Sequence, residues 1–281
     1  MAADRTTRPR GRPRSADPER AGGVQSLERA LGLMSALARL DGATLSELAL
    51  RTGTPPSSAH RLLSTLQAAR WVAFDETRGE WAIGVEAFRA GSAFLRRAGV
   101  VEAARETMRA LVEQTGETAN VAVPDGGEVV FVSQVETSHP IRAFFGEGAR
   151  SPMHASGIGK ALLAELPRAE AERRLMAVGL TEFTPRTLAS PEALFADLAR
   201  IRARGWALDD EERNPGMRCV AAAIFNAHGE AVAGLSISGP TARLPMETVA
   251  EFGPVVRRAA AAVTERIGGV APEREGARAT G

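Results

Sequence analysis

The pattern of hydrophobic and polar positions predicts a helical N-terminal region. Apolar residues recur at helical spacing from Leu27 to Ala38, and we expect Ser26 to cap the helix that they form. A second, short helix begins at Thr44, where the sequence Thr-Leu-Ser-Glu has the form of a capping box, and it ends at Gly53. The glycine provides the tight turn into a third helix.

A third helix and a hairpin complete this N-terminal module. Pro55 and Pro56 suit the first turn of a helix, where a missing N–H costs nothing. Residues 71–74 and 80–83 are typical of two short strands joined by a tight turn. Three helices followed by a hairpin are the element order of a winged helix-turn-helix. We therefore predict that fold for residues 23–84.

The pattern changes after a predicted linker helix over residues 85–99. We expect helices near 101–114, 157–165, 168–177, 191–204 and 246–267, and strands at 119–123, 128–135, 220–225 and 232–238. The Asp-Gly-Gly sequence at 125–127 predicts a hairpin between the first two strands. Residues 100–270 are therefore expected to form an α+β domain, an antiparallel sheet flanked by helices.

Composition excludes several classes of protein. The chain of 281 residues has no apolar run near the ~20 residues that a membrane-spanning helix needs, and its N-terminus lacks an apolar signal segment. Cys219 is the single cysteine, so no intramolecular disulfide is possible, and the four histidines show no metal-ligand spacing. We expect a cytoplasmic protein without a metal or a cofactor.

Positive charge is concentrated in the first 22 residues, which carry six arginines against three acidic residues. This segment is rich in proline and glycine, and we expect a disordered basic arm, with a second disordered segment at 271–281. Arg10 and Arg12 lie in the sequence Pro-Arg-Gly-Arg-Pro, the core of an AT-hook, whose extended form fits an A·T minor groove. The alternative is a generic basic tail; both readings imply contact with nucleic acid.

The third helix has the composition of a DNA-recognition helix. A recognition helix places its N-terminal end in the major groove, and here that end presents Pro56, Ser57, Ser58 and Arg61. Short hydroxyls suit phosphate or base-edge contacts, and Arg61 can reach either a guanine or a phosphate. Arg78, at the tip of the hairpin, is placed as a wing contact. The alternative is that these are solvated residues of a three-helix bundle.

These segments resemble the IclR family of transcriptional regulators. The resemblance extends from about residue 23 to 267 and lies in the stretches 24–31, 45–49, 56–63, 153–164, 209–212, 216–222 and 234–240. It implies a GAF-like effector domain, control of operator binding by a ligand, and a homodimer that usually pairs into a tetramer. Val85, Phe88 and Leu95 line one side of the linker helix, which we expect to form the dimer contact.

The residues of the C-terminal half predict a site for a small anion. Ser156, Gly157 and Ile158 open a helix, whose free amides favour a carboxylate. Ser236 and Ser238 point to one face of their strand and offer two hydroxyls. Each feature has a structural alternative: a half-exposed Ser-x-Ser strand or a turn before a helix. We predict an effector site because these features together resemble the pattern of the IclR family.

Two further site residues and the ligand class depend more on resemblance. Cys219 provides a small, mildly apolar wall, although a lone cysteine is usually a buried hydrophobe. By resemblance, Asp209 contacts the carbonyl end of the ligand. The pattern is similar to that of the branch that senses glyoxylate, with an aromatic or other carboxylic acid as the alternative. One departure is Ala223, where many members carry proline.

Other functions fit the sequence less well. Lys160 follows a glycine, but the phosphate-binding loop needs glycine at 154 and Ser or Thr at 161, and the chain has His154 and Ala161. A thiol nucleophile at Cys219 lacks an orienting third group. A chromatin protein that uses the arm alone would leave most of the chain without a purpose. We therefore expect a regulator that binds double-stranded operator DNA, and not an enzyme.

Overall fold

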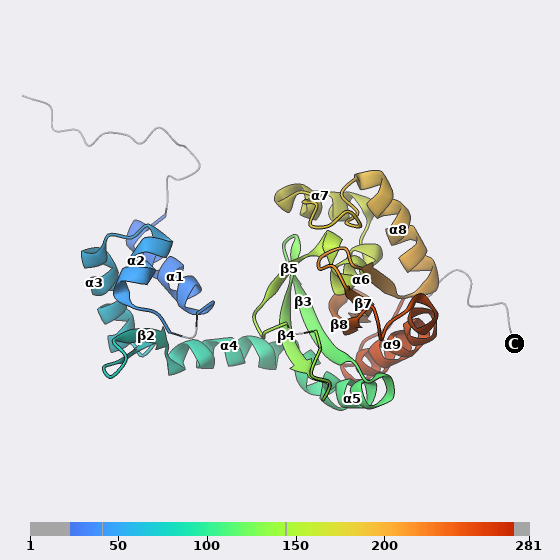
Figure 1. Cartoon of the computed structure of the whole chain (residues 1–281), viewed down its shortest axis with the longest axis horizontal. Coiled ribbons are helices and arrows are strands. Elements are labelled where there is room, and N and C mark those ends of the chain that lie inside the picture. The colour runs from blue at the N-terminus through green and yellow to red at the C-terminus, as the bar shows by residue number, and fades with distance from the viewer. Residues whose placement is uncertain (1–22, 41, 144, 273–281) are drawn as a thin grey trace, which may run out of the picture. The chain divides into compact units, whose positions relative to one another are not determined.

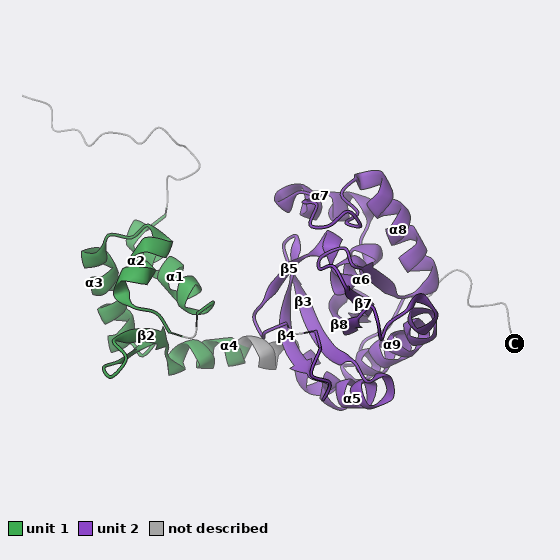
Figure 2. Cartoon of the chain, viewed as in Figure 1, with its two compact units in different colours: residues 1–94 green, residues 95–281 purple. Residues whose placement is uncertain are grey.

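The computed structural model describes residues 23–40, 42–143 and 145–272, which form two compact units that meet between residues 94 and 95 (Figure 2). The boundary falls within helix α4 (Val85–Ala98), the predicted linker helix. The basic arm with Arg10 and Arg12, and residues 273–281, lie outside the described residues. No helix in the described ranges is long and apolar enough to cross a membrane.

The smaller unit has the predicted order of three helices and a hairpin. Its elements are α1 (Gln25–Leu37), α2 (Leu45–Thr52), α3 (Pro56–Ala68), β1 (Val72–Asp75) and β2 (Glu80–Ile83). The capping box is confirmed, because the amide of Glu47 donates to the Thr44 hydroxyl and Thr44 N donates to Glu47 Oε2 at 3.1 Å. Gly53 follows α2 in the left-handed conformation, with φ of 62°, and allows the turn into α3.

The predicted cap of the first helix is wrong. Val24 is the N-cap residue and Ser26 lies inside the first turn, without a capping hydrogen bond. The helix begins two residues earlier because the carbonyl of Val24 already accepts from the amides of Leu27 and Glu28, at 2.8 and 3.1 Å. The Ser26 hydroxyl is therefore not used to hold the helix end.

The core of the smaller unit holds α3 with one side toward solvent. Leu33 and Leu37 of α1, Leu48 of α2 and Leu63 of α3 are fully buried together with Trp81 of the hairpin. The backbone groups of Ala43 and Trp81 exchange two hydrogen bonds, of 2.8 and 2.9 Å, which tie the hairpin to the segment before α2.

The larger unit is an α+β domain built on one six-stranded antiparallel sheet, with strand order β5-β4-β3-β8-β7-β6 (Figure 1). Its strands are β3 (Thr118–Asp125), β4 (Glu128–Val135), β5 (Arg150–Pro152), β6 (Ala207–Asp210), β7 (Met217–Phe225) and β8 (Ala231–Pro240). Its helices are α5 (Val100–Thr115), α6 (Gly157–Glu165), α7 (Arg168–Val178), α8 (Pro191–Arg204) and α9 (Met246–Arg266). The predicted α+β class is confirmed, although sequence patterning missed the two shortest strands, β5 and β6.

The two faces of this sheet pack against different helices. On one face, residues such as Val121, Val220 and Ile237 form a core with α5 and α9. On the other face, residues such as Ala122 and Ala221 pack against α6, α7 and α8. Because neighbouring side chains of a strand alternate between faces, Ser236 and Ser238 lie on the α6 side of β8 and Leu235 and Ile237 lie on the other.

Candidate DNA-recognition helix and effector site

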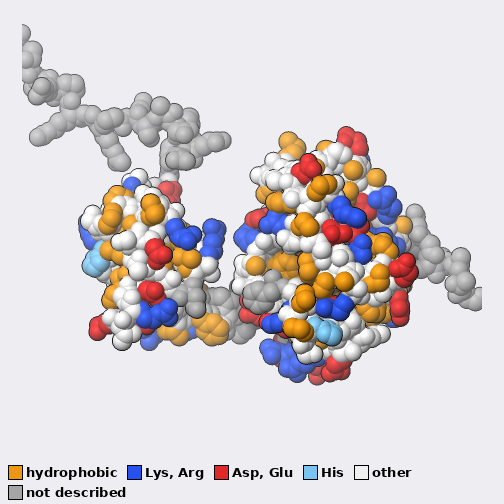
Figure 3. Space-filling view, in the orientation of Figure 1, with side chains coloured by type: hydrophobic (Ala, Val, Ile, Leu, Met, Phe, Trp, Pro, Cys, Tyr) orange, Lys and Arg blue, Asp and Glu red, His pale blue; other side chains and the backbone are white. Residues whose placement is uncertain are grey.

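The N-terminal end of α3 is open to solvent and carries no acidic residue. Pro56 occupies the first helical position, as expected for a residue without an N–H. Pro56, Ser57 and Arg61 are exposed, and Ser58 is half-buried, whereas Ala59 and Leu63 face the core. The four predicted contact residues of α3 therefore lie outside the core of the unit. Figure 3 shows basic side chains on the surface of this unit.

The hairpin turn presents Arg78 at its tip. Asp75 organises the turn, since its Oδ1 accepts from the Thr77 hydroxyl at 2.6 Å and from the amides of Thr77 and Arg78 at 2.9 and 3.2 Å. These hydrogen bonds, first of all that of the Thr77 hydroxyl, lower the pKa of the Asp75 carboxyl. The guanidinium of Arg78 pairs with Glu80 at 2.9 Å and its side chain is 61% exposed. A wing contact with DNA would have to compete with this surface pair.

Two rows of polar residues cross the α6 face of the sheet. In the first row the strand register places Thr118, Ser238, Cys219 and Asp209 opposite one another on β3, β8, β7 and β6. In the second row Gln134, Asn120 and Ser236 lie opposite one another on β4, β3 and β8. The register thus brings together four residues that are far apart in the sequence and that we predicted as site residues: Asp209, Cys219, Ser236 and Ser238.

The N-terminus of α6 lies directly on these rows. Ser156 is the N-cap of α6, and its hydroxyl accepts from the amide of Gly159 at 3.3 Å. A Cβ on Gly157 would lie 2.8 Å from Cys219 Sγ, and 3.4 Å from the Cβ of Ala221, so only glycine permits this approach. The side chain of Ile158 is buried in the core, which leaves only its backbone for a ligand. We call these residues of α6 and the two rows the polar cluster.

Asn120 and Gln134 belong to the polar cluster but were not predicted. Gln134 Nε2 donates to Asn120 Oδ1 at 2.9 Å, and Asn120 Nδ2 donates to Ser238 Oγ at 3.4 Å. These two hydrogen bonds link Gln134 of β4 to Ser238 of β8 through Asn120 of β3. The alternation of Thr118 and Asn120 in β3 was one signal for this row. The predicted hairpin gave the pairing of β3 with β4, but the pairing of β3 with β8 could not be identified from sequence.

Burial shifts the ionisation of two groups in the polar cluster. Burial raises the pKa of the Asp209 carboxyl to about 6, although Asp209 Oδ1 accepts from the amide of Glu212 at 2.8 Å. Burial, together with the Asp209 charge, raises the pKa of the Cys219 thiol to about 11. Cys219 therefore stays a neutral thiol at physiological pH and is a poor nucleophile.

A buried lysine beside the polar cluster was also missed. Lys160 of α6 is 1% exposed, and its ammonium donates to Asp197 Oδ2 at 2.9 Å and to Glu212 Oε1 at 2.5 Å. Burial raises the pKa of Glu212 to about 7 despite this ion pair. The signal in the sequence was a lone lysine in the apolar helix Ile-Gly-Lys-Ala-Leu-Leu, because a helix that is apolar all round is buried.

Three buried polar atoms within the described ranges have no hydrogen-bond partner: Ser236 Oγ, Glu212 Oε2 and His154 Nδ1. Unsatisfied buried polar atoms are costly, so each requires an explanation. Ser236 lies within the polar cluster, and Glu212 adjoins it because its backbone N–H donates a hydrogen bond to Asp209 Oδ1. Two of the three unpartnered groups therefore lie in or beside the polar cluster.

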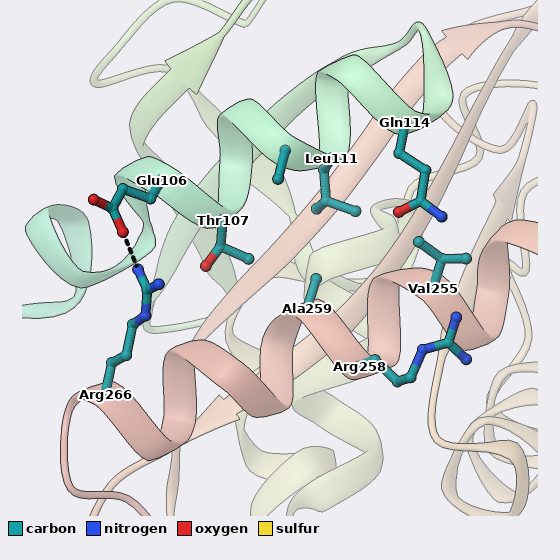
Figure 4. A pocket seen from close by; sticks show the side chains of 9 residues that line it. Glu106, Thr107, Leu111, Gln114, Val255, Arg258, Ala259 and Arg266 are labelled. Carbon is teal, nitrogen blue, oxygen red and sulfur yellow. Dashed lines mark ion pairs between the residues drawn. The ribbon is translucent and has the colours of Figure 1, made fainter.

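A groove between α5 and α9 is a different feature of the larger unit (Figure 4). It has a volume of about 410 Å³ and includes the apolar residues Leu111, Val255 and Ala259. The basic and acidic groups at one end already pair, since Arg266 Nη1 lies 3.0 Å from Glu106 Oε2. None of the predicted effector residues lines this groove.

Two family models match the chain. Residues 26–76 match the IclR helix-turn-helix domain, and residues 92–265 match the C-terminal domain of the bacterial transcriptional regulator IclR. The two matched ranges contain α3 and the polar cluster respectively.

Characterised relatives extend over nearly the whole chain. The transcriptional regulator BhcR of Paracoccus denitrificans is 49% identical over 95% of both chains, and the transcriptional repressor IclR of Escherichia coli is 43% identical over 93% of this chain and 97% of its own. The acetate operon repressor of Salmonella typhimurium is 41% identical over 88% of this chain and 92% of its own.

Solved structures share the fold. A putative transcriptional regulator from Rhodococcus has a TM-score of 0.75 at 30% identity, covering 87% of this chain and 98% of its own. An IclR homologue from Microbacterium hydrocarbonoxydans, crystallised with 4-hydroxybenzoate, has a TM-score of 0.76 at 23% identity, covering 86% of this chain and 98% of its own.

Proposed function

The chain belongs to the IclR family of bacterial transcriptional regulators, and we propose that it binds operator DNA through α3 and senses glyoxylate or a similar small 2-oxo acid in the polar cluster. The prediction of a ligand-responsive DNA-binding regulator, and not an enzyme, is confirmed by family membership. The residues that contact DNA and ligand, and the identity of the ligand, are our proposal.

The unpartnered hydroxyl of Ser236 is the observation that carries the proposed effector site. This oxygen is buried beside the half-buried thiol of Cys219 and in the strand next to Asn120. A buried hydroxyl can donate one hydrogen bond and accept others, and leaving it unpaired costs about 1–3 kcal/mol. A ligand oxygen that accepts from Ser236 and Ser238 removes that cost.

The polar cluster offers complementary groups to the two ends of a 2-oxo acid. Its carboxylate accepts hydrogen bonds from the amides of Gly157 and Ile158 at the N-terminus of α6, and from the hydroxyls of Ser236 and Ser238. Its carbonyl, or the hydrate of that carbonyl, faces Cys219 and Asp209. Since burial raises the pKa of Asp209 to about 6, the protonated carboxyl donates a hydrogen bond there below that pH.

The close approach of α6 favours a ligand of few atoms. Gly157 packs directly against Cys219 and Ala221, so a bulky ligand group cannot enter at this contact. An aromatic acid is the alternative, and 4-hydroxybenzoate is bound by the Microbacterium homologue, but at 23% identity that structure supports only the fold. A ligand of few atoms binds weakly, with a dissociation constant on the order of micromolar to millimolar.

Ligand control of DNA binding requires two conformations with different affinities for the ligand. The effector shifts the equilibrium only by the ratio of its affinities for the two states. Operator recognition by a winged helix-turn-helix also requires a dimer, because one recognition helix reads a short half-site. We therefore propose a homodimer or a dimer of dimers as the DNA-binding form.

Calorimetry on the full chain tests the effector proposal, with glyoxylate, pyruvate and 4-hydroxybenzoate as separate ligands. We expect heat with glyoxylate or pyruvate and none after Ser236→Ala and Ser238→Ala are combined. Ser35→Ala, on the exposed side of α1, is the matched control. Heat with 4-hydroxybenzoate alone would contradict the small-acid proposal and leave the regulator assignment intact.

A DNA-binding assay on the same proteins tests the link between the two units. The ligand that gives heat should change the affinity for an operator duplex selected by the protein from a random library. The serine double variant should bind that duplex as the parent does and ignore the ligand. A ligand that binds without any effect on DNA affinity would contradict its role as an effector.

A further inference from the structure

A cleft between α1 and α3 is the feature of the smaller unit that the family assignment leaves unexplained. It has a volume of about 230 Å³ and is distinct from the apolar core beneath it. The lining residues are Ser26 and Arg29 of α1 and Ser58, Arg61, Leu62 and Thr65 of α3. Five of these six side chains are polar, and two are arginines on opposite walls.

The charges of the cleft are not compensated by the residues that the structure describes. None of its described lining residues is acidic, and neither Arg29 nor Arg61 forms an ion pair or a side-chain hydrogen bond with the described part of the chain. Two other arginines of this unit are paired with acidic residues, Arg70 with Glu86 at 2.7 Å and Arg78 with Glu80 at 2.9 Å. Two guanidinium groups across a narrow cleft repel each other, and an anion between them removes the repulsion.

Two of the three hydroxyls of the cleft can bind the same anion. Thr65 Oγ1 donates to the carbonyl oxygen of Arg61 at 2.9 Å, so this hydroxyl is already used. Ser26 is not the cap of α1, and Ser58 is half-buried on the cleft wall. Two guanidinium groups and two serine hydroxyls can together donate hydrogen bonds to the oxygens of one phosphate.

Helical geometry separates this cleft from the face of α3 that points outward. At about 100° per residue, α3 has three sides: Ala59, Leu63 and Leu66 face the core, whereas Ser58, Arg61, Leu62 and Thr65 face α1. The third side carries Ser57, His60 and Ser64. Arg61 and Ser58 therefore lie on the side of α3 that adjoins the outward face. If the outward face lies in the major groove, the DNA backbone runs along this adjoining side.

We propose that the cleft between α1 and α3 binds one phosphate of the DNA backbone, clamped between Arg29 and Arg61. The inference rests on the proposed docking of α3 in the major groove. In this proposal Arg61 and Ser58 contact the DNA backbone. Ser57 and His60, on the outward side of α3, contact the base edges. Phosphate contacts fix the orientation of a recognition helix and carry no sequence information.

The salt dependence of binding measures a phosphate contact directly. Each neutralised phosphate contributes about 0.9 to the slope of log affinity against log salt. Arg29→Ala should therefore make the slope shallower by about 0.9, so that the fold-loss of affinity between 50 and 200 mM salt becomes about 3.5 times smaller. The weakening should be equal on operator and on unrelated DNA, since the contact reads no base.

The experiment compares full-length variants by fluorescence anisotropy on two duplexes, one selected by the protein from a random library and one unrelated. Arg29→Ala and Arg61→Ala should weaken binding to both duplexes by the same factor, and the double variant should lower the slope by about 0.9 and not by twice that value. His60→Ala should weaken only the selected duplex and leave the slope unchanged. Arg39→Ala, an exposed arginine after the end of α1, is the matched control.

A neutral methylphosphonate at each backbone position locates the clamp. One position in each half-site should weaken the parent protein and leave Arg29→Ala unaffected. The inference is overturned if Arg29→Ala, folded as judged by circular dichroism, keeps the parent's slope, or if it loses affinity only for the selected duplex. A parent protein that selects no sequence would contradict the proposed function instead, and the slope on unrelated DNA would still decide whether the cleft binds phosphate.

Discussion

The ammonium of Lys160 lies 2.5 Å from Glu212 Oε1 beneath the surface of the effector domain. The same ammonium holds Asp197 of α8, so one side chain of α6 joins a neighbouring helix to the segment after β6. That segment carries Glu212, whose amide donates to Asp209 of the polar cluster. The buried lysine therefore holds in place a residue that we propose to contact the effector.

Lys160→Met should strongly destabilise the effector domain. Removing one partner of a buried ion pair leaves uncompensated charge, which costs about 3–5 kcal/mol of the free energy of unfolding. Urea denaturation followed by circular dichroism measures the loss. Because burial raises the pKa of Glu212 to about 7, this carboxyl is protonated in acid, and the loss should be smaller at about pH 5.5 than at about pH 8.

Arg168→Ala is the matched control for the lysine variant. Arg168 pairs with Glu172 at 2.8 Å on the exposed side of α7, and an exposed pair contributes about 0–1 kcal/mol. Equal stabilities for Lys160→Met and Arg168→Ala would show that the buried pair does not stabilise the domain.

Affinity for an anionic effector should fall as pH rises from about 5.5 to about 8. Burial raises the pKa of Asp209 to about 6 and that of Glu212 to about 7, so both groups lose protons in this interval. Each deprotonation adds negative charge near a ligand whose carboxylate is already ionised, and like charges repel. Calorimetry at several pH values on the full chain measures the effect. Asp209→Asn should flatten the dependence, and an affinity that rises with pH would contradict this assignment of charge.

Self-association should depend on α4. Phe88 of α4 is 72% exposed and Val85 is 53% exposed, unusual exposures for large apolar side chains, while the side chain of Leu95 lies outside the described residues. Phe88→Glu should shift the sedimentation coefficient toward that of a monomer and weaken binding to a two-half-site operator.

Met176→Glu is the control for the Phe88 variant. Met176 of α7 is 84% exposed, so the substitution places the same charge on another exposed apolar residue. A Phe88→Glu protein that sediments like the parent would exclude α4 as the contact between copies.

Deletion of residues 1–22 should weaken DNA binding without abolishing it. The segment has a net charge of +3, and fewer counterions are released when it is removed, so the salt dependence becomes shallower. If the Arg10–Arg12 sequence acts as an AT-hook, the loss should be greater on operators with A·T flanks than on those with G·C flanks. Equal losses on both duplexes, measured by gel shift, would leave only a basic tail.

Local patterns in the sequence were sufficient for the fold class and for the order of every helix and strand except the two short strands β5 and β6. The capping box at Thr44 and the turn at Gly53 depend on neighbours within a few residues, which is why they could be predicted. The alternation of strand residues also placed Ser236 and Ser238 on one face. The cap at Ser26 was wrong because the carbonyl of Val24, two residues earlier, accepts the first hydrogen bonds of the helix, and a backbone acceptor has no signature in sequence.

The sequence by itself determined that a helix-turn-helix precedes an α+β sensor, because helical and strand periods are local and resemblance needs only residue order. Only the tertiary structure decided which residues share a site. Asp209, Cys219 and Ser238 lie in one row because β6, β7 and β8 pair in a particular register, and register depends on contacts between distant segments. The burial of Lys160 and the cleft between Arg29 and Arg61 arise in the same way, since a helix's neighbours are set by packing and not by its own sequence.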